Sequence, residues 1–213
     1  MLGIVNYGAF VASTVALCLT PGIDTVYILT RSLAGGRREG VASALGINTG
    51  LLVHTVLVAT GLSLLLSACV PAFFAVKLCG AAYLVFMGVR SIVAAVRGEA
   101  GALSVGEGAR ASDPRKTYLQ GVATNVLNPK IVLFFLALLP QFVSPGNAFG
   151  PVPFLVLGLT YVVFSTVWTL VLVMASAPLS GWLSSGESAG RVTGVVSGIV
   201  YMALGAMVFA TKS

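Results

Sequence analysis

Two short proline motifs place charged residues of opposite sign inside long apolar segments. The first, T-P-G-I-D, runs from Thr20 to Asp24, and the second, N-P-K, runs from Asn128 to Lys130. An ionisable side chain at membrane depth is energetically costly and usually functional, so both motifs point to a substrate or ion site. An acid and a base held together there could bind the ammonium and the carboxylate of a zwitterion.

Each charged residue also has a purely structural interpretation. Asp24 follows its proline by three positions, where a carboxylate favours the dipole of a restarted helix, so it could be a cap or half of a packed ion pair. Lys130 lies too deep in its segment to reach water easily. A buried pair alone is weak evidence for stability, because desolvation offsets attraction. We therefore interpret Asp24 as an ammonium or proton partner, and Lys130 and Asn128 as carboxylate partners, of an amino-acid substrate.

Four residues are expected to interrupt the helices at these motifs: Thr20, Pro21, Gly22 and Pro129. Thr and Asn are good N-caps and Pro suits the first helical position, so each motif can end one half-helix and start another. Each break lies about 15 Å from the basic end of its segment, which is half the thickness of a hydrocarbon core. Both restarted half-helices would then direct their positive ends toward the midplane, where an anionic group could be held.

The composition indicates an all-α integral membrane protein. Of the 213 residues, 57% are hydrophobic and 8% are charged, against about 25% charged in soluble domains. The formal net charge is +6, but the basic residues are scattered over short connections, which argues against a nucleic-acid partner. The 3 cysteines are isolated in apolar stretches, so neither a metal site nor a thiol-based electron carrier is indicated. We predict no metal and no cofactor.

Six apolar segments are long enough to cross a bilayer. They cover residues 4–30, 41–66, 72–96, 118–140, 152–177 and 192–211. A polar loop at 97–117 separates a three-helix half (1–96) from a second three-helix half (118–213) within one transporter domain, 1–213.

Basic residues gather in the connections after the first, third and fifth segments. Positively charged connections remain in the cytoplasm, so we expect the 97–117 loop inside and both termini outside. With three spans each, the two halves would cross the membrane in opposite directions, as in a 3+3 inverted repeat whose helices 1 and 4 are broken by proline.

Further polar and small residues occur in the second apolar segment. Asn48 and Thr55 are seven positions apart and share a helix face, and we include Asn48 among the substrate-binding candidates. His54 is the sole histidine; among apolar neighbours it is more often a hydrogen-bonded packing residue than a proton relay. Gly46-x-x-x-Gly50 offers a small face for close helix contact, inside the molecule or in a homodimer.

Taken in order, these motifs resemble the LysE/RhtB family of amino-acid exporters. The resemblance runs from the T-P-G-I-D motif through the basic turn and the G-x-x-x-G helix to the N-P-K motif, Phe134, Phe135 and the P-Q-F sequence at 140–142. It also includes the K-L-C-G-A-A-Y-L sequence that begins at Lys77. The usual family motif is P-G-P-D, and this chain has Ile23 in place of its second proline. The resemblance implies proton-driven efflux of an amino acid or related metabolite across a bacterial inner (plasma) membrane.

We therefore predict a secondary transporter, and not an enzyme, that exports an amino acid or derivative by proton antiport, with Asp24 also carrying the proton. A cation exporter is less favoured, because hard cations prefer several oxygen ligands and one deep carboxylate is visible. Export of another metabolite stays open. A membrane enzyme would need a nucleophile and a base, and His54 has no such partner motif. A membrane assembly protein is the non-transport alternative, since proline-kinked helices can be purely structural.

Overall fold

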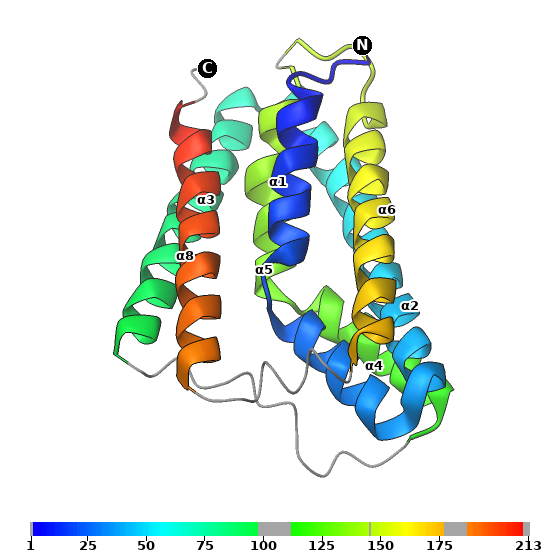
Figure 1. Ribbon diagram of the computed structural model, residues 1–213. Helices are drawn as coiled ribbons and strands as arrows, with labels where there is room; N and C mark the ends of the chain where they lie inside the picture. Colours follow the sequence, from blue (N-terminus) through cyan, green and yellow to red (C-terminus); the bar gives the residue numbers. More distant parts are fainter. Residues whose placement is uncertain (1, 98–111, 145, 177–186, 211–213) are drawn as a thin grey trace.

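The computed structural model is all-helical and describes residues 2–97, 112–144, 146–176 and 187–210 (Figure 1). Most of the loop expected at 97–117 lies outside these ranges. The elements are α1 (Tyr7–Leu19), α2 (Ile23–Ala68), α3 (Val70–Val96), α4 (Pro114–Val126), α5 (Pro129–Leu133), the π-helical η1 (Phe134–Leu138), the 3-10 helix η2 (Leu139–Phe142), α6 (Val152–Met174) and α8 (Glu187–Ala210).

Both predicted helix breaks are present. Between α1 and α2 the backbone of Thr20 is extended, with φ −74° and ψ 113°. Between α4 and α5 Asn128 is extended in the same way, and its side chain accepts a hydrogen bond of 3.0 Å from the backbone N–H of Lys130. Pro129 then opens α5 at a position where the missing N–H costs no helical hydrogen bond. The axis bends by 46° at this second break.

The basic turn expected after the first segment is centred on Gly36, where φ is 66° and ψ is −164°. Two helical stretches meet at this non-helical residue, and together they make up the 46 residues of α2. Only glycine adopts such a conformation readily. A Cβ on the preceding Gly35 would collide with the Glu39 carboxyl group. Two adjacent glycines thus turn the chain while Arg37 and Arg38, which are good helix formers, keep it helical on the far side.

The helices pack so that the broken segments lie in the middle. α2 packs along α4 and α6, and α3 packs along α8. In Figure 1, α1 and the α5–η1 segment stand side by side between α6 and the α3–α8 pair. Fully buried aromatic side chains fill this centre, including Phe10 and Phe142, whose rings meet edge to face with centroids 5.2 Å apart. The outer surface is also apolar: Val163 and Val167 are 62% and 61% exposed, as expected for a face toward lipid.

In the described ranges, three helices are long and apolar enough to cross a membrane, at Ile23–Leu64, Leu78–Val96 and Val152–Met174. A fourth is obtained if α4 and the helix ending at Phe142 count as one bent span. α1 has 13 residues, about 20 Å of helix, and is too short to cross alone. The breaks therefore account for the first and fourth of the six predicted segments, and the sixth is found as a shorter apolar helix, Gly194–Ala206.

The helix ends divide into two groups (Figure 1). The beginning of α1 and the end of α8 lie at one end of the molecule. The end of α3 and the beginnings of α4 and α8 lie at the opposite end, with the kink of α2. The connections rich in Arg and Lys adjoin this second group, which therefore forms the basic end of the molecule.

Small residues bring α2 and α4 into close contact. A Cβ on Gly46 would collide with the Tyr118 carbonyl and lie 3.0 Å from the Cα of Gly121. A Cβ on Gly50 would lie 2.7 Å from the Cβ of Asn125. Within the described residues, the G-x-x-x-G face thus forms a contact between two helices of the same molecule.

Gly46→Ala should destabilise the protein. The new methyl group would force apart two backbones that have no flexible atom to move, at a cost of about 1–3 kcal/mol. Gly61→Ala on the same helix is the matched control, because a Cβ there meets nothing within 4 Å and alanine favours a helix. Thermal unfolding in detergent should show a lower midpoint for Gly46→Ala alone. Equal midpoints for the two variants would contradict this account of the α2–α4 contact.

Candidate functional site

Lys130 joins the two helix breaks. Its Nζ donates hydrogen bonds to the carbonyl oxygens of Thr20, at 2.7 Å, and Leu17, at 3.1 Å. These carbonyls belong to the last turn of α1, where oxygens lack helical partners and the dipole favours a cation. We predicted Asp24 or a substrate carboxylate as the partner of Lys130. In the structure the lysine caps the end of α1, and the one ion pair among the described residues is Arg31–Glu39. The role of Lys130 as the partner of a substrate carboxylate stays a prediction.

Asp24 is held by Asn125 of α4. Its Oδ2 accepts a hydrogen bond of 2.9 Å from the Nδ2 of Asn125, which is fully buried near the end of α4. Gly50 leaves the room that the Asn125 side chain occupies.

A small cavity lies between the two breaks, bordered by residues of α1, α2, α5 and α6. Its volume of about 30 Å³ is room for about two water molecules. The lining residues are Leu17, Cys18, Thr20, Gly22, Asp24, Thr25, Ile28, Ile47, Asn128, Lys130, Ile131, Tyr161, Ser165, Trp168, Thr169 and Leu172.

Most of the predicted site residues border this cavity. Asp24, Asn128 and Lys130 meet there with two of the break residues, Thr20 and Gly22. Pro21 and Pro129 shape the breaks without lining the cavity.

Asn48 does not line the cavity either. It lies behind the wall, donating hydrogen bonds of 3.0 Å to Thr169 Oγ1 and 2.8 Å to the Ala44 carbonyl. Its place behind Thr169 makes it a support for a lining residue.

Three lining residues carry a buried polar atom without a hydrogen-bond partner among the described residues. They are the Oδ1 of Asp24, the Nδ2 of Asn128 and the Nε1 of Trp168. A buried polar atom left without a partner costs about 1–3 kcal/mol, so such atoms are rare in native structures and need an explanation. One is an acceptor and two are donors. A bound molecule or water with both kinds of group would satisfy them.

His54 packs behind this site. Its Nε2 lies 3.2 Å from the carbonyl oxygen of Asn125, and its ring lies 5.8 Å from that of Phe135. His54 is 6% exposed and does not border the cavity. These contacts fit the packing interpretation better than a proton relay.

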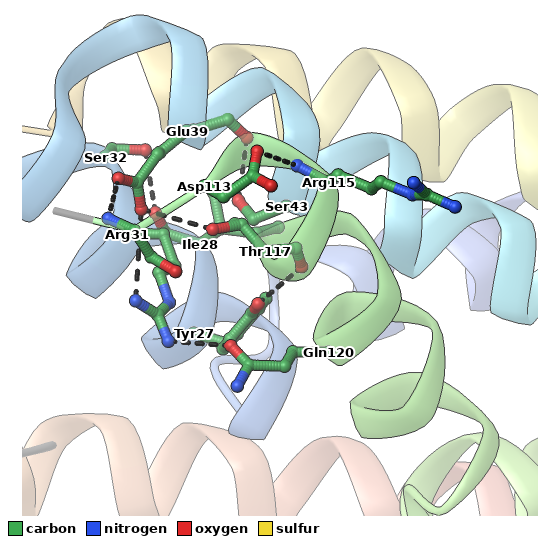
Figure 2. A network of polar contacts seen from close by, with 12 residues as sticks. Tyr27, Ile28, Arg31, Ser32, Glu39, Ser43, Asp113, Arg115, Thr117 and Gln120 are labelled. Atoms are coloured by element: carbon green, nitrogen blue, oxygen red, sulfur yellow. Dashed lines mark hydrogen bonds and ion pairs between the residues drawn. The ribbon is translucent and has the colours of Figure 1, made fainter.

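A second polar cluster closes the space between α2 and α4 toward the basic end of the molecule. Figure 2 shows Glu39, just after the kink of α2, reaching Thr117 on α4. The Glu39 carboxylate accepts a hydrogen bond of 3.2 Å from Thr117 Oγ1 and another from the backbone N–H of Ser112. It also pairs with Arg31 at 3.9 Å. Glu39 is 2% exposed, so this carboxylate is buried and fully engaged.

Residues before the kink complete the cluster. Arg31 donates a hydrogen bond of 2.8 Å to Gln120 Oε1 and lies over the ring of Tyr27, 5.7 Å from its centroid. The Tyr27 hydroxyl donates to the Thr117 carbonyl at 2.6 Å. Tyr27 is about one helical turn beyond Asp24, so the cluster begins about 5 Å further along α2 than this carboxylate. We call these residues, Tyr27, Arg31, Glu39, Thr117 and Gln120, the inner cluster.

The broken helices and the polar cavity can now be set beside known proteins. The model of the LysE type translocator family matches residues 15–212. The chain belongs to this family. Among its relatives is the homoserine/homoserine lactone efflux protein of Salmonella typhimurium, which is 30% identical over 204 residues that cover 96% of each chain. The corresponding protein of Salmonella typhi is 29% identical over 204 residues, with the same coverage.

Other LysE relatives carry no stated substrate. An uncharacterized membrane protein of Pseudomonas aeruginosa is 30% identical over 181 residues, which are 85% of this chain and 84% of the relative. No solved structure matches this one significantly. The comparisons confirm the resemblance drawn from the motifs: this LysE translocator is a multi-pass membrane transporter and not an enzyme.

Lys130→Met should destabilise the protein, because the carbonyls of Thr20 and Leu17 would lose a charged donor. Hydrogen bonds to charged groups contribute about 1.5–3 kcal/mol each, so the loss should be about 2 kcal/mol or more. Lys116→Met is the control, since Lys116 is exposed on α4. Thermal unfolding of the purified variants measures the difference. A Lys130→Met protein as stable as Lys116→Met would refute the capping role.

Proposed function

We propose that the protein exports an amino acid or amino-acid derivative from the cytoplasm and binds it in the cavity between the two helix breaks. The observation that carries the proposal is the set of unpartnered buried atoms on Asp24 and Asn128 beside the Lys130 ammonium. An acceptor and two kinds of donor around one small space complement a zwitterion. The Salmonella relatives are homoserine/homoserine lactone efflux proteins, so homoserine and its lactone are the substrates to be tested first.

In this proposal each end of the substrate has its own partner. The ammonium binds Asp24 through the free Oδ1, while Asn125 holds Oδ2. The carboxylate accepts from Asn128 Nδ2 and from the Lys130 ammonium, which has three N–H donors, of which two bond to α1. A lactone has no free carboxylate, so the ammonium contact is the one that both forms would share.

The substrate requires the cavity to widen. Space for about two water molecules is less than an amino acid needs, so the described conformation is a closed one. Alternating access supplies the opening: rocking of one half against the other would expose the site to each side in turn. Proton antiport follows if Asp24 takes up a proton as the ammonium leaves.

The membrane arrangement in this proposal has six spans in a 3+3 inverted repeat. α1 with the first part of α2 would form one broken span, and α4 with α5, η1 and η2 the other. The grouping of the first and last helix ends at one end of the molecule favours an even number of crossings. The basic end would face the cytoplasm, with both termini outside.

The inner cluster would close the cytoplasmic side of the cavity. It ties the kink of α2 to α4 through the buried Glu39 carboxylate, between the cavity and the basic end. Its bonds must break for the substrate to enter from the cytoplasm.

The function is tested by uptake of labelled homoserine into inverted membrane vesicles with an imposed proton gradient. Asp24→Asn should abolish uptake at matched membrane abundance. Loss of the charged partner of a buried ion costs about 3–5 kcal/mol, which is at least a hundredfold in affinity. Asp113→Asn is the matched control. Asp113 caps α4 by accepting from Arg115 N–H at 3.1 Å, and asparagine caps equally well.

Two results would count against the proposal in different ways. Full uptake by Asp24→Asn would remove Asp24 from the site. No uptake of any amino acid or lactone by well-inserted wild type would favour a cation or other exported metabolite, or a role in membrane assembly.

Glu39→Gln should open the cytoplasmic side. Cys18 lines the cavity, so in a protein with Cys69 and Cys79 replaced by serine it reports access by an impermeant thiol reagent added to inverted vesicles. Removing the charge weakens the bond to Thr117 and the pair with Arg31, and labelling of Cys18 should rise about threefold to tenfold. Arg38→Gln, at an exposed position near the same kink, should label like the parent. Unchanged labelling of Glu39→Gln would show that the inner cluster does not limit entry.

A further inference from the structure

One face of α6 supplies a wall of the cavity that the amino-acid head group does not use. Its lining residues occur three or four positions apart, at Tyr161, Ser165, Trp168, Thr169 and Leu172, and this spacing places them along one helix face. The charged and amide groups lie on the opposite elements, at the breaks of α1–α2 and α4–α5. The α6 face therefore meets whatever part of a bound molecule points away from the breaks.

Trp168 is the residue of this face whose polar atom lacks a hydrogen-bond partner. Its indole Nε1 is buried and has no hydrogen-bond partner among the described residues. An indole N–H can only donate. The residue packs against an apolar cluster whose side chains cannot accept a hydrogen bond: Ile28, Ala44, Ile47, Leu172 and Val173. Leaving such a donor unpaired costs about 1–3 kcal/mol.

The neighbouring hydroxyl groups differ in how many hydrogen bonds they already make. Thr169 is engaged on both sides: its Oγ1 accepts from Asn48 at 3.0 Å and donates to the Thr166 carbonyl at 3.1 Å. Ser165 is 6% exposed, borders the cavity and is free of hydrogen bonds to the described residues. Trp168 and Ser165 thus border the same space, and one carries a buried donor without a partner while the other carries a rotatable hydroxyl.

We propose that Trp168 and Ser165 form a side-chain subsite that recognises an oxygen atom on the side chain of the exported molecule. This inference rests on the proposed function and adds the basis on which the transporter would select among amino-acid side chains. A hydroxyl or ester oxygen at this place accepts from Trp168 Nε1, while Ser165 can donate to or accept from the same group. A hydrocarbon side chain of the same length leaves the indole N–H unpaired, and sites built in this way reject the analogue that lacks the oxygen.

The test compares two amino acids that differ in one oxygen atom, homoserine and 2-aminobutyrate, as substrates for uptake into inverted vesicles. Wild type should prefer homoserine. Trp168→Phe keeps an aromatic ring and removes the N–H, so the ratio of kcat/KM for homoserine over 2-aminobutyrate should fall about threefold to tenfold, the equivalent of one hydrogen bond. Ser165→Ala should lower the same ratio.

A matched control removes a polar contact to α6 outside the cavity. The Tyr7 hydroxyl bonds to Thr160 Oγ1 at 3.0 Å, and Tyr7→Phe should leave the ratio unchanged. Asp24→Asn should abolish the uptake of both amino acids, because both share the ammonium group, and it therefore gives no information on side-chain preference.

The outcomes separate the two proposals. A ratio unchanged by Trp168→Phe, while Asp24→Asn still abolishes uptake, overturns the subsite and leaves the export function standing. Equal loss of both substrates in Trp168→Phe assigns the tryptophan to packing and also overturns the subsite. Absence of uptake of both substrates in wild type, while another amino acid is taken up, overturns the subsite, and absence of uptake of any amino acid or lactone overturns the export function itself.

Discussion

The bond between the Lys130 ammonium and the open end of α1 is the constraint on which the centre of this protein depends. A helix broken inside a membrane leaves carbonyl groups with no water to accept from. Lys130 satisfies those of Thr20 and Leu17 from the other half of the chain. One break thus supplies the donor that the other lacks, and the two breaks face each other across this contact.

The remaining features follow from keeping that contact in place. Gly46 and Gly50 let α4 approach α2 closely, which brings Asn125 onto Asp24. The inner cluster fixes the far ends of the same two helices around Glu39. Between these contacts a small polar space remains, with the break residues on one side and α6 on the other. Binding groups are therefore concentrated where helical hydrogen bonding is interrupted.

The sequence predicted the parts of this arrangement that depend on local chemistry. Proline after a capping residue interrupts a helix whatever surrounds it, so both breaks and the group of Asp24, Asn128 and Lys130 could be found in advance. The basic turn around Gly36 was expected, but its tightness was not, because helix-forming residues on both sides continue up to a single non-helical glycine. Long-range partners were missed as well. The carbonyls that bind Lys130 come from α1, more than 100 positions away in the chain, and backbone carbonyls leave no mark in a sequence.

The pairing of one buried acid with one buried base also has an electrical consequence. With Asp24 as carboxylate and Lys130 as ammonium, the empty site has no net charge, and a bound zwitterion adds none. The membrane potential then does no work on the substrate-loaded step of the proposed cycle. A proton carried back on Asp24 adds one positive charge to the site, on which the field acts with about 2.3 kcal/mol per 100 mV. Voltage would therefore drive the return of the carrier and leave the export step to the concentration gradient.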